Sequence, residues 1–269
     1  MTDRQPYAFF LTLEGIDGAG KSSHLVALRE HFEAMCRAVV MTREPDGTPL
    51  AEARRQMILQ DAMDLLTEAL LIFAARRDHI VCVSVIARAL ARGDVGVCDR
   101  FTDSTFAYQG LGHRFPLQVL EQLEQWVQAE LQPDLTLWFD LSPEVAATRL
   151  ADARAPGRFE GEQLEFFSRV RAGYAARAEQ VPERFVRVDA EETQHEIWKR
   201  IESALANAPS RSNTWSDRRR EERCADGPGV RHVPAATRLP CRGLQARAAD
   251  GRAQRLGSAS ATCSAPAAA

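Results

Sequence analysis

The stretch that decides the fold is Gly15-Ile16-Asp17-Gly18-Ala19-Gly20-Lys21-Ser22, in a chain of 269 residues. It has the spacing GxxxxGK followed by Ser or Thr, and it lies between an apolar run at residues 9–13 and a helical pattern that begins at about residue 22. In this context the glycines let backbone N–H groups converge on phosphate oxygens, and the helix N-terminus adds its dipole. The stretch therefore predicts a P-loop that binds a nucleoside triphosphate. The less specific alternative is a glycine turn that only joins a strand to a helix.

Two side chains of this loop carry the expected chemistry. Lys21 offers a point charge to the β- and γ-phosphates, and the Ser22 hydroxyl is a ligand for Mg²⁺. Lys21 is one of only two lysines in a chain that otherwise uses arginine, which indicates a specific requirement for a compact ammonium. The expected ATP-binding residues of the loop are Gly15, Ile16, Asp17, Gly18, Ala19, Gly20, Lys21, Ser22 and Ser23.

Five short apolar runs rich in β-formers alternate with helical stretches, at residues 9–13, 38–42, 95–98, 135–141 and 184–188. This alternation predicts an α/β fold of the P-loop NTPase type, a doubly wound sheet of five parallel strands with helices on both faces. Residues 64–91 have the length and periodicity of one long buried helix or a helix pair. Ser142 followed by Pro143 predicts a helix that begins there.

The pattern stops after Ala206. Residues 207–269 contain eleven arginines and fourteen alanines but only five residues from Val, Leu, Ile, Phe and Met, too few to build a core. Residues 1–206 carry 23 Lys and Arg against 32 Asp and Glu, whereas the tail carries 11 against 5. The sequence thus predicts one domain at 1–206 and a disordered tail at 207–269, which could also be the product of reading a GC-rich gene out of frame. Acidic residues interrupt the basic tail, so no nucleic-acid partner is expected.

Composition also excludes other classes of protein. No run of about 18 apolar residues exists to cross a bilayer, and the polar start of the chain has no apolar signal core behind it, so a cytoplasmic protein is expected. The six cysteines show no CxxC pair, which argues against a zinc site or a disulfide scaffold. Cys36, Cys82 and Cys98 are predicted to be core thiols.

A P-loop alone does not distinguish a kinase from a GTPase or a motor ATPase. The sequence shows no NKxD-type guanine motif, and the third predicted strand ends in Asp99-Arg100-Phe101 rather than in a DxxG switch. An acid at this strand end can organise Mg²⁺ or its waters, and Arg100 can bind a second phosphate. The alternative for Asp99 and Arg100 is a surface ion pair. The balance favours a kinase.

Four further segments carry a resemblance. Residues 42–48 read TREPDGT, 73–79 read FAARRDH, 99–110 read DRFTDSTFAYQG and 140–144 read DLSPE. They resemble, in order and spacing, the TREPGGT, FAAxR, DRxxxSxxAYQG and DxxPE segments of bacterial thymidylate kinases, with Asp46 where that family usually has glycine. The resemblance extends from about Tyr7 to Ala206. It implies phosphorylation of dTMP to dTDP by ATP and Mg²⁺, with ATP and dTMP as small-molecule partners, no membrane and a homodimer.

The resemblance also implies roles for individual residues. Phe73 would stack on the thymine ring, Arg77 would reach the base or its phosphate, and Tyr108 would lie beneath the sugar. Without the motif, Phe73 and Tyr108 would be interpreted as packing residues, and Gln109 could equally be an ordinary loop residue. The implied dTMP-binding residues are Arg43, Glu44, Phe73, Arg77, Arg100, Ser104, Thr105, Tyr108 and Gln109.

The P-loop contains no arginine, so the catalytic arginine is expected from a lid at about 152–162, a segment with Pro156, Gly157 and Gly161. The candidates are Arg154 and Arg158, whose alternative is a solvated surface charge, and Arg149 is a candidate for the adenine site. The expected catalytic residues are Lys21, Asp17, Arg100, Arg154 and Arg158, and the expected metal-binding residues are Ser22 and Asp99.

Two rival functions remain open at this stage. A deoxynucleoside kinase would share the P-loop and the DR strand end but would accept a neutral nucleoside; the TREPDG segment and the lid arginines argue against it. A catalytically impaired nucleotide-binding module is the other alternative. No catalytic residue is missing, although Asp46 and the tail leave room for impairment.

Overall fold

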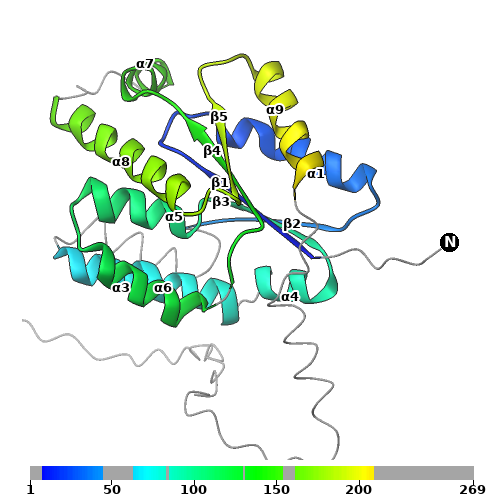
Figure 1. The fold of residues 1–269 in the computed structure, drawn as a ribbon, viewed down its shortest axis with the longest axis horizontal. Coiled ribbons are helices and arrows are strands. Elements are labelled where there is room, and N and C mark those ends of the chain that lie inside the picture. The colour runs from blue at the N-terminus through cyan, green and yellow to red at the C-terminus, as the bar shows by residue number, and fades with distance from the viewer. Residues whose placement is uncertain (1–7, 45–62, 83–84, 130, 154–160, 209–269) are drawn as a thin grey trace, which may run out of the picture. The chain divides into compact units, whose positions relative to one another are not determined.

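A computed structural model describes residues 8–44, 63–82, 85–129, 131–153 and 161–208 (Figure 1). Within these residues, five strands form one parallel sheet in the order β2-β3-β1-β4-β5. The strands are β1 (Phe9–Glu14), β2 (Val39–Arg43), β3 (Val95–Asp99), β4 (Leu135–Asp140) and β5 (Phe185–Asp189). Each strand falls within one or two residues of its predicted run, and the doubly wound fold with a central β1 is confirmed.

The helices begin and end largely where the sequence indicates. They are η1 (Lys21–His24), α1 (Leu25–Ala34), α3 (Leu65–Arg77), η2 (Asp78–Cys82), α4 (Val85–Arg92), α5 (Thr102–Thr105), η3 (Phe106–Gly112), α6 (Leu117–Gln128), α7 (Pro143–Ala153), α8 (Gly161–Gln180) and α9 (Gln194–Asn207). The described residues between 64 and 91 are helical, in α3, η2 and α4, and α3 is capped by Asp64, whose side chain accepts hydrogen bonds from the backbone of Leu66 and Thr67. The helix predicted at Pro143 begins there. Helix α9 ends at Asn207, one residue beyond the expected domain boundary.

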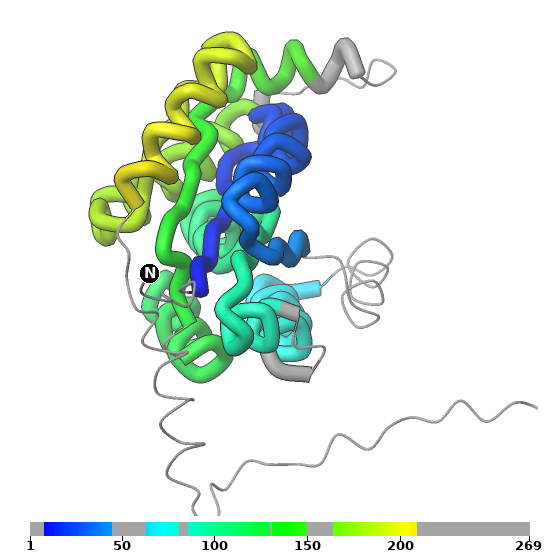
Figure 2. The backbone as a smooth tube through the Cα atoms, turned by 90° about the vertical axis from the view of Figure 1, so that its right-hand side faces the viewer, coloured from blue at the N-terminus to red at the C-terminus, as the bar shows by residue number. Residues whose placement is uncertain are grey.

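The helices cover both faces of the sheet. Helices α1 and α9 lie side by side on one face, where the His31 and Trp198 rings meet edge to face with centroids 6.1 Å apart (Figures 1 and 2). Helices α3, α6 and α8 lie on the other face (Figure 1). Along β1, side chains alternate between the two faces, so that Leu11 and Leu13 pack in one cluster and Phe10 in another. None of the described helices is long and apolar enough to span a membrane.

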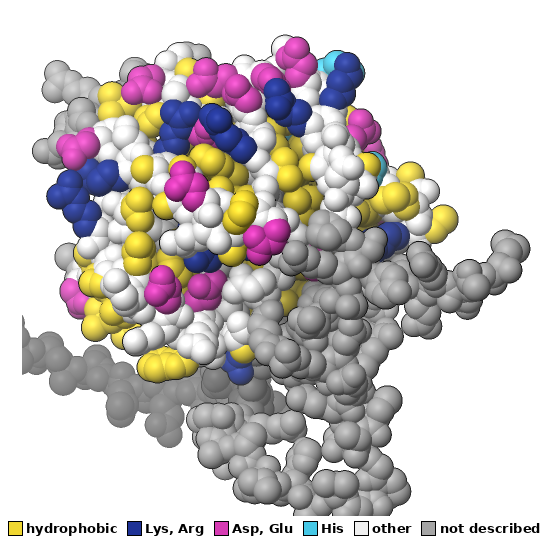
Figure 3. All heavy atoms as spheres, viewed as in Figure 1, with side chains coloured by type: hydrophobic (Ala, Val, Ile, Leu, Met, Phe, Trp, Pro, Cys, Tyr) yellow, Lys and Arg dark blue, Asp and Glu magenta, His cyan; other side chains and the backbone are white. Residues whose placement is uncertain are grey.

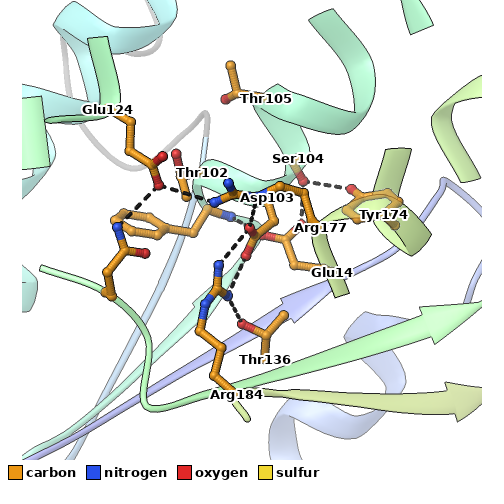
Figure 4. A network of polar contacts seen from close by, with 12 residues as sticks. Glu14, Thr102, Asp103, Ser104, Thr105, Glu124, Thr136, Tyr174, Arg177 and Arg184 are labelled. Atoms are coloured by element: carbon orange, nitrogen blue, oxygen red, sulfur yellow. Dashed lines mark hydrogen bonds and ion pairs between the residues drawn. The ribbon is translucent and has the colours of Figure 1, made fainter. Parts of the chain in front are cut away.

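Polar residues between the sheet and the short helix α5 hold this helix in place (Figure 4). The fully buried Asp103 accepts hydrogen bonds from Arg184 at 2.7 and 2.8 Å and from Arg177 Nε at 2.9 Å. Arg177 also contacts Glu124 on α6 at 3.2 Å. The two arginines offset the desolvation of Asp103 and keep its pKa below the usual value, although burial acts to raise it. This network ties α5 to α6, to α8 and to the start of β5.

The cysteine predictions have mixed outcomes. Cys98 is buried, as expected. Cys36 is exposed, and its prediction as a core thiol is wrong, because it lies in the turn after α1 with φ of 56°. The side chain of Cys82 lies outside the described part of the chain.

Candidate active site

The P-loop follows the carboxyl end of β1 at the centre of the sheet. Strand pairing places Leu13 of β1 and Arg43 of β2 beside Asp99 of β3, so three chain segments meet at this edge. Gly15 has φ of 138°, and a Cβ at that position would collide with the carbonyl oxygen of Phe139. Only glycine fits there, which explains why the loop begins with one.

Lys21 is held inside this loop. Its side chain is largely buried, and Nζ donates to the carbonyls of Gly15 at 3.1 Å and Ile16 at 3.2 Å. Burial, together with the nearby Arg100 charge, lowers the pKa of Lys21 to about 7 despite the carboxylates of Asp99 and Asp17. The two carbonyls therefore hold Nζ at the loop, and the negative charge of a bound triphosphate would favour its protonated form.

Ser22 and Asp99 meet at the same place. Ser22 Oγ donates to Asp99 Oδ2 at 3.4 Å, and Asp99 Oδ1 is buried and accepts no hydrogen bond from any described residue. A buried carboxylate oxygen without a donor is suited to a hard cation, because carboxylate and hydroxyl oxygens are ligands that Mg²⁺ prefers. The two residues named from the sequence thus fit a magnesium ion.

Arg100 lies next to Asp99 and faces the P-loop. Its Nη2 donates to Asp17 Oδ1 at 2.6 Å, and its Nη1 contacts the hydroxyls of Ser104 at 3.3 Å and Tyr174 at 3.1 Å. The guanidinium also lies 5.2 Å from the centroid of the Tyr108 ring. Asp17, Arg100, Ser104 and Tyr108 are therefore brought together.

A second arginine joins this region from α3. Arg76 donates through Nε to Glu44 at 2.8 Å and through Nη2 to Thr105 Oγ1 at 2.9 Å. Glu44 also contacts His79 Nδ1 at 3.1 Å. Burial acts to raise the pKa of Glu44, but Arg76 and His79 outweigh it and hold the pKa below its usual value. Glu44 thus orients Arg76 in this structure, and its expected contact with the substrate stays a prediction.

Two residues of α3 that were expected at the substrate contact other parts of the protein in this structure. The exposed Arg77 lies on another face of the helix and donates to the carbonyl of Val127 on α6 at 2.8 Å. Phe73 is only 1% exposed, packs among α6 side chains and has the Arg76 guanidinium 5.0 Å from its ring centroid. This packing matches the core-residue alternative, and the contact of Phe73 with the base stays a prediction.

The remaining sequence-predicted residues lie around the same sheet edge or beside the P-loop. Arg43 is exposed at the end of β2. Gln109 is buried on η3, and its Nε2 donates to Glu68 at 3.0 Å. Arg149 joins the P-loop to the segment after β5, because it donates to the carbonyls of Gly18 at 3.4 Å and Ala190 at 3.0 Å. Arg154 and Arg158 lie outside the described residues.

Sequence reasoning missed Glu14, Arg76 and Tyr174. Helical periodicity could have found Arg76, because it follows Ala69 by seven residues, nearly two full turns, and so shares the buried face of α3. Glu14 could have been noticed as an acid at the end of an apolar strand. No local signal distinguishes Tyr174, whose hydroxyl contacts Ser104 from 70 residues away in sequence.

Comparisons with known proteins agree on one family. A family model described as thymidylate kinase matches residues 13–201. A thymidylate kinase of Polaromonas sp. (strain JS666) is 53% identical over 215 residues, which cover 72% of this chain and 95% of the relative. A thymidylate kinase of Ralstonia nicotianae is 55% identical over 202 residues, which cover 74% of this chain and 98% of the relative. A crystal structure of thymidylate kinase from Ehrlichia chaffeensis is similar with a TM-score of 0.59 and 31% identity, covering 74% of this chain and 99% of that one.

Proposed function

The chain belongs to the thymidylate kinase family and phosphorylates dTMP to dTDP with ATP, and from this premise we propose how its own residues perform the reaction. The observation that carries the proposal is the meeting of Lys21, Asp99 and Arg100 at one edge of the sheet. Lys21 binds the β- and γ-phosphates of ATP, and Arg100 binds the phosphate of dTMP. Two anions must approach each other in this transfer, and cations between them reduce the repulsion.

Ser22 and Asp99 would hold Mg²⁺. The ion, when bound, neutralises charge on the transferred phosphoryl group. The fit rests on the buried Asp99 Oδ1, which accepts no hydrogen bond from the described residues. Removal of Mg²⁺ by a chelator should abolish turnover, whereas an Asp99→Asn enzyme should need a higher Mg²⁺ concentration for half-maximal rate. An unchanged Mg²⁺ requirement in that variant would refute the assignment.

The acceptor side would be formed by Asp17, Arg43, Arg100, Ser104, Thr105, Tyr108 and Gln109. Arg100 and Asp17 form an ion pair at 2.6 Å, and we expect both side chains to lie beside the transferred group. Arg149 and the residues from Gly15 to Ser23 would bind ATP, because Arg149 already contacts the loop carbonyl of Gly18. Replacing each of these residues singly would test its contact with ATP or with dTMP.

Acceptor preference tests the function as a whole. Turnover should be fastest with dTMP, and dUMP should be weaker by roughly 1–3 kcal/mol because it lacks one methyl contact. The measurement is ADP release by the full chain with dTMP, dUMP, dCMP, dGMP and dAMP. A purine monophosphate with a comparable kcat/KM, or a strong preference for thymidine over dTMP, would contradict the proposal.

Neighbouring arginines on α3 provide a matched pair. Because Arg76 faces Thr105 and Glu44 while Arg77 faces α6, Arg76→Ala should lower kcat/KM for dTMP by about 10- to 100-fold. Arg77→Ala should change it by less than about twofold. Steady-state kinetics with dTMP varied at saturating ATP decides the matter. Equal losses in both variants, or a larger loss for Arg77→Ala, would restore the original expectation for Arg77.

A homodimer is the proposed assembly, formed through α3 and α6. Leu66 and Leu70 on α3 are 47% and 48% exposed, and Trp126 on α6 is 72% exposed. Figure 3 shows hydrophobic side chains at the lower left, over these two helices. Exposed large apolar side chains on neighbouring helices are typical of a protein interface. Sedimentation should give a dimer that Trp126→Glu dissociates; a monomeric wild-type chain would refute this assembly.

The C-terminal residues 207–269 would contribute nothing to the reaction, because the family model ends at residue 201 and every proposed site residue precedes it. A chain that ends at Asn207, the last residue of α9, should retain its turnover and melting temperature. Loss of cooperative unfolding in that chain would show that the tail is structural. We place the reaction in the cytoplasm, where ATP and dTMP are found, and cell fractionation would test this.

A further inference from the structure

The backbone of Arg100 adopts a conformation that needs external support. Its φ is 69°, in the left-handed region that residues with a Cβ rarely occupy. Two consecutive amides fix it. Arg100 N–H donates to the carbonyl of Leu13 at 2.9 Å, and Phe101 N–H donates to the carboxylate of Glu14 at 2.8 Å. The end of β1 therefore imposes the turn that follows β3.

The Glu14 carboxylate is also linked to the guanidinium of Arg100, through the hydroxyl of Ser104. Ser104 Oγ donates to the second oxygen of Glu14 at 2.5 Å and lies 2.8 Å from the Tyr174 hydroxyl. Arg100 Nη1 donates to both of these hydroxyls. Figure 4 shows Glu14, Ser104 and Tyr174 turned toward one another from β1, α5 and α8. One side chain thus anchors both the main chain and, through Ser104, the cationic end of Arg100.

Glu14 is an unusual residue to bury for stability alone. It is fully buried, and no ion pair of Glu14 is found among the described residues, whereas the neighbouring Asp103 is paired with Arg177 and Arg184. Burial and the Asp103 carboxylate raise the pKa of Glu14 to about 7. A well-packed apolar side chain would avoid this desolvation cost but could not accept either hydrogen bond. The buried carboxylate therefore serves to orient the groups that it binds, the Phe101 amide and the Ser104 hydroxyl.

We propose that Glu14 is a positioning residue of the kinase reaction, which holds Arg100 in the orientation that binds the acceptor phosphate. The proposal rests on the function proposed above for Arg100. Glu14 does not touch either substrate. It acts through two hydrogen bonds, one to the Phe101 amide and one to the Ser104 hydroxyl.

A double-mutant cycle tests the proposal on the full chain. Glu14→Leu removes both acceptors and should lower kcat/KM for dTMP by about 10- to 100-fold, with a raised KM for dTMP and a KM for ATP within about twofold of wild type. Glu14→Gln keeps the acceptor for Phe101 and can donate to Ser104, so it should restore the rate to within about threefold. In an Arg100→Ala background, Glu14→Leu should lower kcat/KM for dTMP by less than a further factor of about two.

A matched control comes from the same strand. Thr12 is buried on β1 and its hydroxyl contacts that of Thr136 at 2.9 Å, away from Arg100. Thr12→Val removes a buried hydrogen bond and should leave KM for dTMP unchanged. If Glu14→Leu does not unfold cooperatively, Ser104→Ala replaces it as the test, because it removes only the hydroxyl that links Glu14 to Arg100. Ser104→Ala should raise KM for dTMP about fivefold or more. In the Arg100→Ala background it should have no such effect.

Three results would overturn the inference. The first is a full, additive loss from Glu14→Leu in the Arg100→Ala background, and the second is an equal rise in KM for dTMP in Thr12→Val. The third is a Glu14→Gln enzyme as impaired as Glu14→Leu. An Arg100→Ala enzyme with unchanged kinetics would refute the role of Arg100 in the proposed function, and the inference with it, so the two failures are distinguishable.

Discussion

Replacement of Lys21 by alanine is expected to lower kcat by about 10³-fold or more. The Gly15 and Ile16 carbonyls already hold Lys21 Nζ at the loop, and a bound triphosphate would favour its protonated form, so little rearrangement is needed before it meets the β- and γ-phosphates. A preorganised cation in a largely buried position stabilises developing charge more strongly than a mobile, solvated one. The loss should therefore fall mainly on kcat, measured with both substrates saturating.

The chain supplies its own control for this variant. Lys199 is the only other lysine, and it is exposed on α9. Lys199→Ala should keep wild-type turnover, and both variants should unfold cooperatively on heating. Near-normal kcat in a folded Lys21→Ala enzyme would refute the assignment of the P-loop as the triphosphate site.

The strands and the P-loop could be predicted from sequence because their signals are local. Each strand is a short apolar run between helical stretches, and the loop motif carries its own context on either side. Buried Leu11, Leu13, Val97 and Leu137 show why these runs are apolar, since helices cover both faces of a parallel sheet. Ser22 and Asp99 were also named from sequence, because strand ends in such a sheet meet at one edge.

Site residues chosen by contacts across the fold could not be predicted in the same way. Arg76 and Arg77 are adjacent in one motif, and the resemblance assigned the role to Arg77 without information on which helix face each side chain occupies. Glu14 meets Ser104 across 90 residues of sequence, and Tyr174 meets Ser104 across 70. Such pairs depend on how α5 and α8 pack against β1, which no local pattern encodes.

The lid arginines give the second large effect that we expect. Replacing Arg154 and Arg158 together by alanine should lower kcat by about 10³-fold while KM for dTMP changes by less than about threefold. The reason lies in the charges of the described site. Lys21 is committed to the triphosphate loop and Arg100 is paired with Asp17, and the P-loop carries alanine at position 19 rather than arginine. Beyond Lys21 and Arg100, we therefore expect a further cation to act on the charge that develops during transfer, and the lid arginines would supply it.

Steady-state kinetics separates this role from ground-state binding. Arg100→Ala should raise KM for dTMP as well as lower kcat, because its cation meets the acceptor phosphate before transfer begins. Lysine at positions 154 and 158 should recover only part of the rate, since a point charge cannot reproduce the planar, two-pronged contact of a guanidinium. Arg200, an exposed arginine of α9 that pairs with Glu192, provides a control. Arg200→Ala should leave kcat and KM for dTMP unchanged. A double lid variant with wild-type kcat would show that both arginines are solvated surface charges, and the stabilisation of the transferred phosphoryl group would then have to come from Lys21, Arg100 and Mg²⁺.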